Sequence, residues 1–328
     1  MTSLQTDACA AESLASDNDA QTTGGRCSSE TRATGKVVPL CAHRDDAASA
    51  ADLTYSRIPS IAENQCVVRS NEWVNPEYKH LVLSAPDLAL TVRAGQFFHL
   101  ACPPSNDEVP YLRRPMSIYR VAPENQRIEF LYKVQGVGTR GLAQLNRGDT
   151  LDALGPLGKG FDLPATTGAA HVLLLARGVG LATMAPLAQE AIAAGARVTA
   201  VLSARSPSLV MSADYLRDAG ADIVIVTDDD QTSDVVQVEH LIRRLHASRP
   251  VTFATTCGSN RLLSMLQRVA AELQIPGQIA LEQHMGCAIG ACYACVRPFR
   301  KSAGSDELTY RRVCLDGPVF DLQETTSW

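Results

Sequence analysis

Four cysteines near the C-terminus have a spacing that could bind an iron–sulfur cluster. Cys287, Cys292 and Cys295 form a C-x4-C-x2-C run, and Cys314 follows further along the chain. This is the plant-type ligand spacing of a 2Fe-2S cluster. The residues between the cysteines are nearly all small, which lets backbone N–H groups approach the cluster sulfurs. The pattern therefore predicts a one-electron 2Fe-2S centre.

Two other uses of these cysteines remain open. Structural zinc sites favour C-x2-C pairs, of which this region has only one. Disulfides form in oxidising compartments, and no secretory signal sequence is recognisable before the cysteines. The spacing favours the cluster over both. The remaining six cysteines are scattered and predict free thiols in a reducing compartment, so we expect a cytoplasmic protein.

Composition narrows the class of protein. The chain has 328 residues, enough for two or three domains, and 45% of them are hydrophobic, as in globular proteins. A net charge of −5 gives no basic field for nucleic acid or an anionic membrane. The longest apolar run, residues 169–176, is too short to cross a bilayer. Residues 1–60 are rich in Ala, Ser, Thr and Asp and predict a disordered N-terminal extension.

Residues 61–165 predict an antiparallel β-barrel, because short β-rich runs alternate there with turn residues. The expected strands are 66–69, 80–84, 96–101, 116–121, 127–134 and 149–154.

Two stretches of this barrel could bind phosphate and a flavin. Arg114 stands at a strand start ahead of Pro115, Met116 and Ser117, and an arginine fork is a natural partner for a diphosphate. The second stretch is Leu131, Tyr132 and Lys133, followed by Gly138 and Thr139. Gly138 would let the backbone approach a phosphate at the start of a helix expected over 139–145. Each stretch has a structural alternative, a strand start or a helix N-cap.

Residues 166–280 alternate strands with helices, which predicts a doubly wound α/β domain with a parallel sheet. The expected strands are 171–176, 197–203, 222–227 and 251–256, and the expected helices are 181–194, 213–219, 236–248 and 260–273. Ligands of such sheets bind at the carboxyl ends of the strands.

Three loops lie at those ends. Arg177-Gly178-Val179-Gly180 precedes a helix where a pyrophosphate could bind, although Thr183 stands at the third glycine position of the usual fingerprint. Arg205 follows the next strand and could meet an adenosine phosphate or be an ordinary surface arginine. Cys257-Gly258 ends a strand where a nicotinamide ring could approach, although Cys257 could equally be a buried thiol.

From about residue 66 to 320 the chain resembles the electron-transfer subunit of the class 1B dihydroorotate dehydrogenases, within the ferredoxin–NADP reductase-like superfamily. The matching features are Arg114–Ser117, Leu131–Lys133, Gly138-Thr139, Gly155–Gly158, Cys257-Gly258, the cysteine run and residues 312–320. The order and spacing of these features agree, which is more specific than any one motif.

The resemblance implies an α+β multidomain chain: an antiparallel β-barrel FAD domain, a doubly wound α/β nucleotide-binding domain over 166–280, and a small 2Fe-2S domain over 281–328. FAD would be bound by Arg114, Pro115, Met116, Ser117, Leu131, Tyr132, Lys133, Gly138 and Thr139. NAD(P) would meet Gly178, Gly180 and Cys257, and Cys287, Cys292, Cys295 and Cys314 would ligate the cluster. The implied partner is an FMN-containing catalytic subunit that oxidises dihydroorotate in pyrimidine biosynthesis.

Two loops differ from the family pattern. Family members usually carry a triple glycine where this chain has Ala176-Arg177-Gly178-Val179-Gly180. Their acidic–glycine loop appears here as residues 228–231, Asp-Asp-Asp-Gln. Because both changes fall in the nicotinamide half, two other functions stay open. The chain could serve another partner, such as a sulfide dehydrogenase, hydrogenase or ferredoxin-dependent transhydrogenase, or it could be a non-catalytic redox module that keeps only the cluster.

Overall fold

The computed structural model describes residues 61–105, 108–164 and 170–327. The predicted disordered extension over residues 1–60 lies outside these ranges and stays a prediction. Among the described residues, no helix is long and apolar enough to cross a membrane.

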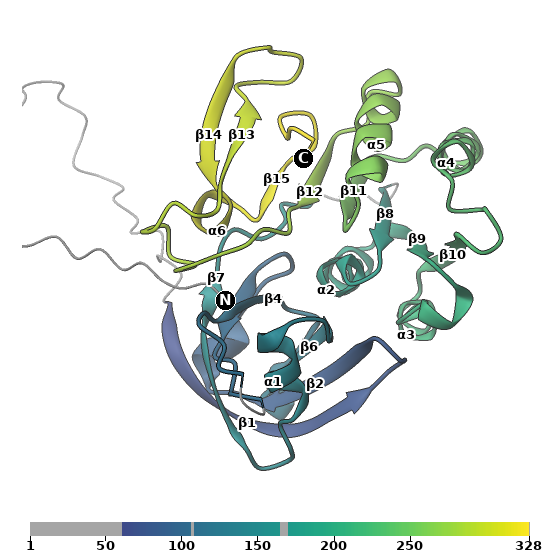
Figure 1. The fold of residues 1–328 in the computed structure, drawn as a ribbon. Coiled ribbons are helices and arrows are strands. Elements are labelled where there is room, and N and C mark those ends of the chain that lie inside the picture. The colour runs from purple at the N-terminus through teal and green to yellow at the C-terminus, as the bar shows by residue number, and fades with distance from the viewer. Residues whose placement is uncertain (1–60, 106–107, 165–169, 328) are drawn as a thin grey trace, which may run out of the picture. The chain divides into compact units, whose positions relative to one another are not determined.

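Seven antiparallel strands form the N-terminal barrel (Figure 1). They are β1 (Ala62–Trp73), β2 (Tyr78–Ser84), β3 (Phe97–Leu100), β4 (Arg114–Ser117), β5 (Arg120–Ala122), β6 (Arg127–Lys133) and β7 (Thr150–Leu157), in the order β4-β3-β7-β1-β2-β6-β5. The helical segments of this region are η1 (Asp87–Thr91), η2 (Pro123–Asn125) and α1 (Val137–Ala143). Phe98 and Phe130 meet edge to face in the barrel core, with ring centroids 5.8 Å apart.

The predicted single strand over 116–121 is wrong in one respect, because the structure divides it into β4 and β5. The Ile118 N–H donates to the Gln96 carbonyl beside β3, at 3.2 Å. The next N–H, of Tyr119, donates to the Glu129 carbonyl of β6, at 2.9 Å. The chain therefore crosses between the two edges of the sheet at this point, which curls the sheet toward closure.

The second half contains a six-stranded sheet in the order β10-β9-β8-β11-β12-β15. Its strands are β8 (His171–Arg177), β9 (Arg197–Ala204), β10 (Asp222–Thr227), β11 (Phe253–Cys257), β12 (Gly277–Ala280) and β15 (Val319–Asp321). All neighbouring pairs are parallel except β12 and β15, which are antiparallel. The helical segments are α2 (Gly180–Ala193), η3 (Pro207–Leu209), α3 (Ala213–Asp218), α4 (Val235–Ser248) and α5 (Asn260–Glu272).

Helices cover both faces of this sheet, so the strands are apolar at successive positions. Val172 and Leu174 of β8 share a core with α2 and α3, whereas Leu173 and Leu175 share a core with α4 and α5. Figure 1 shows these two helix pairs on opposite sides of the strands. The arrangement confirms the doubly wound α/β domain predicted from the alternating pattern.

The C-terminal region is connected to this sheet at both of its ends, through β12 and β15. After β12 come the cysteine loop, the hairpin of β13 (Val296–Arg300) and β14 (Leu308–Arg312), and the short helix α6 (Val313–Asp316). The chain then returns as β15 to the edge of the α/β sheet. The segment from the cysteine loop to α6 therefore lies between two neighbouring strands of one sheet, which fixes both of its ends.

Candidate functional site

The four predicted cluster ligands lie in two pairs. Cys295 Sγ and Cys314 Sγ are 3.2 Å apart, and the backbone N–H of Cys292 donates to Cys287 Sγ at 3.3 Å. All four are free thiols. Within the described ranges, no three His, Cys, Asp or Glu side chains converge on one single-ion position. Two thiol pairs match a 2Fe-2S cluster, whose four protein ligands are shared between two irons.

The backbone of the loop suits anionic sulfur. Burial acts to raise the pKa of the Cys287 thiol, but N–H groups of Cys292, Ile289 and Ala291 outweigh it and lower that pKa to about 7. Burial, followed by the nearby Cys295, raises the pKa of the Cys314 thiol to about 12. The Cys314 thiol is therefore protonated without a cation, and a bound metal ion would deprotonate it. The residues therefore fit an iron–sulfur cluster.

The two pairs differ in exposure. Cys295 and Cys314 are each 2% exposed and belong to the core beside α5, whereas Cys292 is exposed at the surface. Large apolar side chains near Cys292 also reach solvent: Ile289 is 49% exposed and Tyr293 is 63% exposed. The site therefore has one side facing the interior and one side facing outward.

Arg312 at the end of β14 holds the loop from outside. Its Nη1 donates to the Gly290 carbonyl at 3.3 Å, and its guanidinium lies 5.5 Å from the centre of the Tyr293 ring. Gly290 has φ +81°, and an added Cβ would lie 2.7 Å from Leu315. Only glycine fits this position without strain, so the glycine in the cysteine run has a definite structural cause.

The barrel brings together Arg114 and Gly138, one residue from each of the two stretches predicted to bind phosphate and flavin. A Cβ on Gly138 would lie 2.9 Å from Arg114 Nε, so the arginine side chain crosses the first turn of α1. Arg114 Nη1 also donates to the carbonyls of Leu112 and Arg113. The guanidinium is thereby held at a partly exposed position beside β4, where it could meet an anionic group.

Two other predicted flavin residues can contribute little through their side chains. The Thr139 hydroxyl accepts the N–H groups of Gln135 and Gly136, both at 3.0 Å, so it closes the turn before α1. Tyr132 is 1% exposed in the barrel core; its hydroxyl donates to Asn71 Oδ1 at 3.0 Å, and burial raises its pKa. Both residues could offer only backbone groups to a cofactor.

The other two residues of the β6 stretch face the α/β half. Leu131 packs in the core shared with α2, and Lys133 Nζ lies 3.0 Å from Glu77 Oε2. Pro115, Met116 and Ser117 are all partly exposed on β4. The stretches on β4, β6 and α1 thus belong to one side of the barrel, because the chain links β4 to β6 through Ile118 and Tyr119.

A cavity of about 220 Å³ lies at the carboxyl ends of the parallel strands. Its lining residues are Tyr78, Arg177, Gly178, Val179, Ala204, Arg205, Leu209, Gly258 and Glu282. They lie at or just after the carboxyl ends of β8, β9, β11 and β12, and Tyr78 adds a wall from the barrel. This is the position at which open α/β sheets bind their ligands. The cavity includes predicted Gly178 and lies next to Gly180 and Cys257.

Close backbone packing shapes this cavity. Gly258 has φ +92°, and a Cβ there would lie 2.2 Å from the Arg177 carbonyl oxygen. A Cβ on Gly180 would lie 2.6 Å from the Cys257 carbonyl oxygen. Cys257 itself is 1% exposed, and burial raises its pKa well above the ordinary value, so it is a neutral thiol behind the cavity. Its Sγ lies 3.9 Å from Glu282 Oε1.

Several residues of this cavity were not assigned to it from the sequence. Tyr78 comes from the barrel and carries no motif, so no signal in the sequence could have found it. Arg205, by contrast, is predicted from the sequence at this strand end; it forms an ion pair with Glu77 of the barrel, and Lys133 also contacts Glu77. Glu282 stands in the stretch just before the cysteine run, and only the fold shows that its carboxylate lines the cavity.

Residues 282–326 match the family model described as the iron-sulfur cluster binding domain of dihydroorotate dehydrogenase B. The chain is 34% identical over 247 residues to the dihydroorotate dehydrogenase B (NAD(+)) electron transfer subunit of Desulforamulus reducens, covering 75% of this chain and 92% of that protein. It is 32% identical over 253 residues to the protein of the same name from Streptococcus pneumoniae, covering 77% of this chain and 94% of the relative.

Solved structures agree on the fold. A chain of the NADH-dependent reduced ferredoxin–NADP oxidoreductase superposes with a TM-score of 0.65 at 23% identity, covering 79% of this chain and 88% of that chain. The ferredoxin–NADP+ reductase of Plasmodium falciparum gives a TM-score of 0.52 at 14% identity, covering 64% and 91%. The fold is thus that of the ferredoxin–NADP reductases. By its sequence similarity, the chain belongs to the family of dihydroorotate dehydrogenase B electron transfer subunits.

Proposed function

We propose that this chain is an iron–sulfur flavoprotein subunit that passes electrons between a nicotinamide dinucleotide and an FMN-containing dihydroorotate dehydrogenase in pyrimidine biosynthesis. The observation that carries the proposal is the pairing of four free thiols: Cys295 and Cys314 lie in the core, whereas Cys292 is exposed and Cys287 is half-buried. Such a site can accept an electron on one side and release it on the other. We place the activity in the cytoplasm, because four unpaired cysteine ligands require a reducing compartment.

For FAD we propose the side of the barrel that carries β4, β6 and the start of α1. A bound flavin exchanges electrons with nicotinamides in pairs and with iron–sulfur centres singly. The Arg114 guanidinium would bind its diphosphate, and Gly138 leaves the space in which that guanidinium lies. Pro115, Met116, Ser117, Leu131, Lys133 and the backbones of Tyr132 and Thr139 would line the remainder.

For the nicotinamide dinucleotide we propose the 220 Å³ cavity at the strand ends. Gly178 and Gly180 remove side chains where the chain enters α2, so a phosphate could approach the backbone. Gly258 lines the opposite wall with Cys257 behind it, and both residues contact the same loop. Tyr78, from the barrel, closes the cavity toward the proposed flavin side.

For the partner we propose docking at the outward side of the cysteine loop. Ile289 and Tyr293 expose apolar surface there, and Leu315 of α6 is 38% exposed nearby. Exposed apolar side chains that cluster around a redox centre suit a protein interface, because electrons must cross a short path.

A visible absorption spectrum of the purified protein, followed by anaerobic mixing with NADH and NADPH, tests the cofactor part of this proposal. We expect flavin and cluster bands together, and rapid bleaching of the flavin by a nicotinamide. A cluster spectrum without flavin would instead support the non-catalytic redox module. Intact flavin that neither nucleotide reduces would contradict the nicotinamide site.

Reconstitution with an FMN-containing dihydroorotate dehydrogenase tests the partner. We expect a stable complex that forms orotate from dihydroorotate at the expense of NAD+. A flavoprotein that NADH reduces but that neither binds this enzyme nor supports orotate formation would favour another redox partner.

A further inference from the structure

Arg177 is the last residue of β8, and its side chain spans the ends of three neighbouring strands. Its Nη1 donates to Ser203 Oγ of β9 at 2.8 Å. The same guanidinium forms a bidentate ion pair with Asp228, the residue after β10. Nη1 lies 3.1 Å from Oδ1, and Nη2 lies 2.6 Å from Oδ2. The Arg177 side chain is only 19% exposed, yet it lines the 220 Å³ cavity. A cation is therefore fixed at the carboxyl edge of the sheet.

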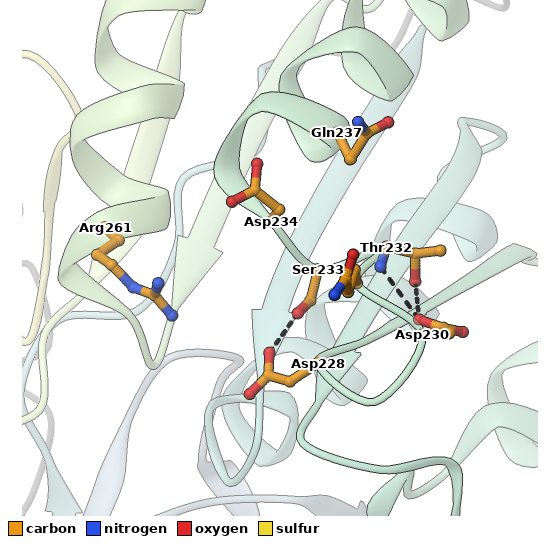
Figure 2. A pocket seen from close by; sticks show the side chains of 8 residues that line it. Asp228, Asp230, Thr232, Ser233, Asp234, Gln237 and Arg261 are labelled. Atoms are coloured by element: carbon orange, nitrogen blue, oxygen red, sulfur yellow. Dashed lines mark hydrogen bonds between the residues drawn. The ribbon is translucent and has the colours of Figure 1, made fainter.

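Asp228 follows β10 and faces a second, larger hollow of about 740 Å³ (Figure 2). Ser233 donates to Asp228 Oδ1, and Figure 2 shows this bond and Arg261 of α5 reaching toward the same hollow. Hydrogen bonds from Arg177 and then Ser233 lower the pKa of Asp228, so the carboxylate is ionised at neutral pH. The ion pair stands between the two hollows, with Arg177 lining one and Asp228 lining the other.

A phosphate could bind the Arg177 guanidinium with the same geometry as the Asp228 carboxylate does. A guanidinium fork binds two carboxylate oxygens and two phosphate oxygens in the same planar, bidentate way. Asp228 is 42% exposed, so it can be displaced toward solvent more easily than the enclosed arginine. Phosphate that reaches the cavity mouth can therefore replace the carboxylate on Arg177.

We propose that Arg177 binds a phosphate of the ADP half of the nicotinamide dinucleotide. In the absence of the dinucleotide, Asp228 forms an ion pair with Arg177 and so competes with that phosphate. The inference rests on the proposed function, since it names a ligand of the same cavity. In this arrangement the ion pair lowers the apparent affinity, because only the fraction of molecules with a released guanidinium binds phosphate well.

Calorimetric titration of the complete protein with ADP-ribose tests the proposal without any redox reaction. Arg177→Ala removes the fork, and we expect ADP-ribose to bind about tenfold more weakly. Asp228→Asn keeps the shape but removes the competing charge, and we expect binding to become about threefold tighter. Arg177→Lys keeps a point charge without the fork and should lie between the wild type and Arg177→Ala.

Arg197→Ala is the matched control. Arg197 and Asp222 form the corresponding ion pair between β9 and β10 at the opposite, amino edge of the sheet. We expect it to leave the dissociation constant of ADP-ribose unchanged.

Opposite shifts for Arg177→Ala and Asp228→Asn are the signature of competition. If the ion pair only stabilises the strand ends, both variants should bind ADP-ribose more weakly, and that outcome would overturn the proposal. Unchanged binding of ADP-ribose by Arg177→Ala would overturn it too. If Arg177→Ala does not fold, the affinity of Asp228→Asn for ADP-ribose tests the proposal by itself. Failure of the proposed function looks different, because neither NADH nor NADPH would then reduce the flavin of the wild-type protein.

Discussion

The cysteine loop and the strand-end cavity are the two regions for which we propose redox roles, and they are built in opposite ways. The loop places three of its four thiols within residues 287–295, and its own N–H groups point at Cys287 Sγ. The cavity collects single residues at or just after the carboxyl ends of β8, β9, β11 and β12, together with Tyr78 from the barrel. The first is a local structure and the second is an assembled one.

This difference decides what a substitution does in each region. In the loop, the chemistry resides in ligand atoms, so loss of one sulfur removes the function while the fold persists. In the cavity, the chemistry resides in spacing between separate strands, so a single added carbon can displace two walls at once. Four predictions follow this contrast, beginning with the largest effect.

Cys314→Ala tests whether the distant fourth thiol belongs to the loop. Cys314 lies 3.2 Å from Cys295 Sγ, so we expect its loss to leave one iron short of a ligand and to abolish cluster binding. Iron and sulfide content and the visible spectrum measure this result, and flavin reduction by NADH should continue. Cys102→Ala, which alters a partly buried barrel thiol, is the control. Full cluster content in Cys314→Ala would mean that another residue supplies the fourth ligand.

Gly258→Ala tests the assembled character of the cavity. The new Cβ would lie 2.2 Å from the Arg177 carbonyl oxygen, so the β11 end and the loop after β8 must separate. A displacement of about 1 Å can cost about a hundredfold in rate, and we expect a loss of that order in flavin reduction by NADH. Flavin and cluster content should stay normal.

Gly195→Ala is the control for backbone strain in this experiment. Gly195 has a similar φ of +85°, but an added Cβ meets nothing within 4 Å. Both alanines carry the cost of a left-handed conformation, about 1–2 kcal/mol of unfolding free energy. Only Gly258→Ala should slow the reduction. Equal rates in the two variants would show that strand-end spacing does not govern the cavity.

Ile289→Glu tests the outward side of the cysteine loop. Ile289 is 49% exposed near Cys292, so a carboxylate there should be tolerated by the fold but not by an apolar interface. We expect the partner subunit to bind about tenfold more weakly, measured by surface plasmon resonance. Val236→Glu on α4, at a residue 55% exposed, should have no effect. An unchanged affinity in Ile289→Glu would place the partner elsewhere on the chain.

Local patterns explain why much of this molecule could be predicted from its sequence. The strand predicted over 222–227 matches β10 at both ends, because an apolar run between turn residues allows one interpretation. The cysteine spacing likewise predicted four thiols that the fold brings into two pairs. In both cases the prediction depends on residues that are close together in the sequence or on a known spacing of cysteine ligands.

Contacts between distant segments could not be predicted in this way. Arg177 and the Asp228 loop each stood out in the sequence as separate departures from a family pattern, and only the parallel register of β8, β9 and β10 makes them partners. The flavin assignment of Tyr132 rested on a motif, whereas strand alternation turns its side chain into the barrel core. Which way a strand faces depends on packing that no short stretch contains.

Arg312→Ala, the smallest expected effect, asks how far the cysteine loop depends on its surroundings. Arg312 donates one hydrogen bond to the Gly290 carbonyl and covers the Tyr293 ring, whereas the predicted ligands come from the loop and α6. One such bond is worth about 1 kcal/mol, so the cluster should form normally but be lost to a chelator about fivefold faster. Arg311→Ala is the matched control, because the neighbouring Arg311 pairs with Glu324 and lies over Phe299, away from the loop. If Arg312→Ala prevented cluster assembly altogether, the loop would depend on β14 for its conformation, and the contrast between a local and an assembled site would no longer hold.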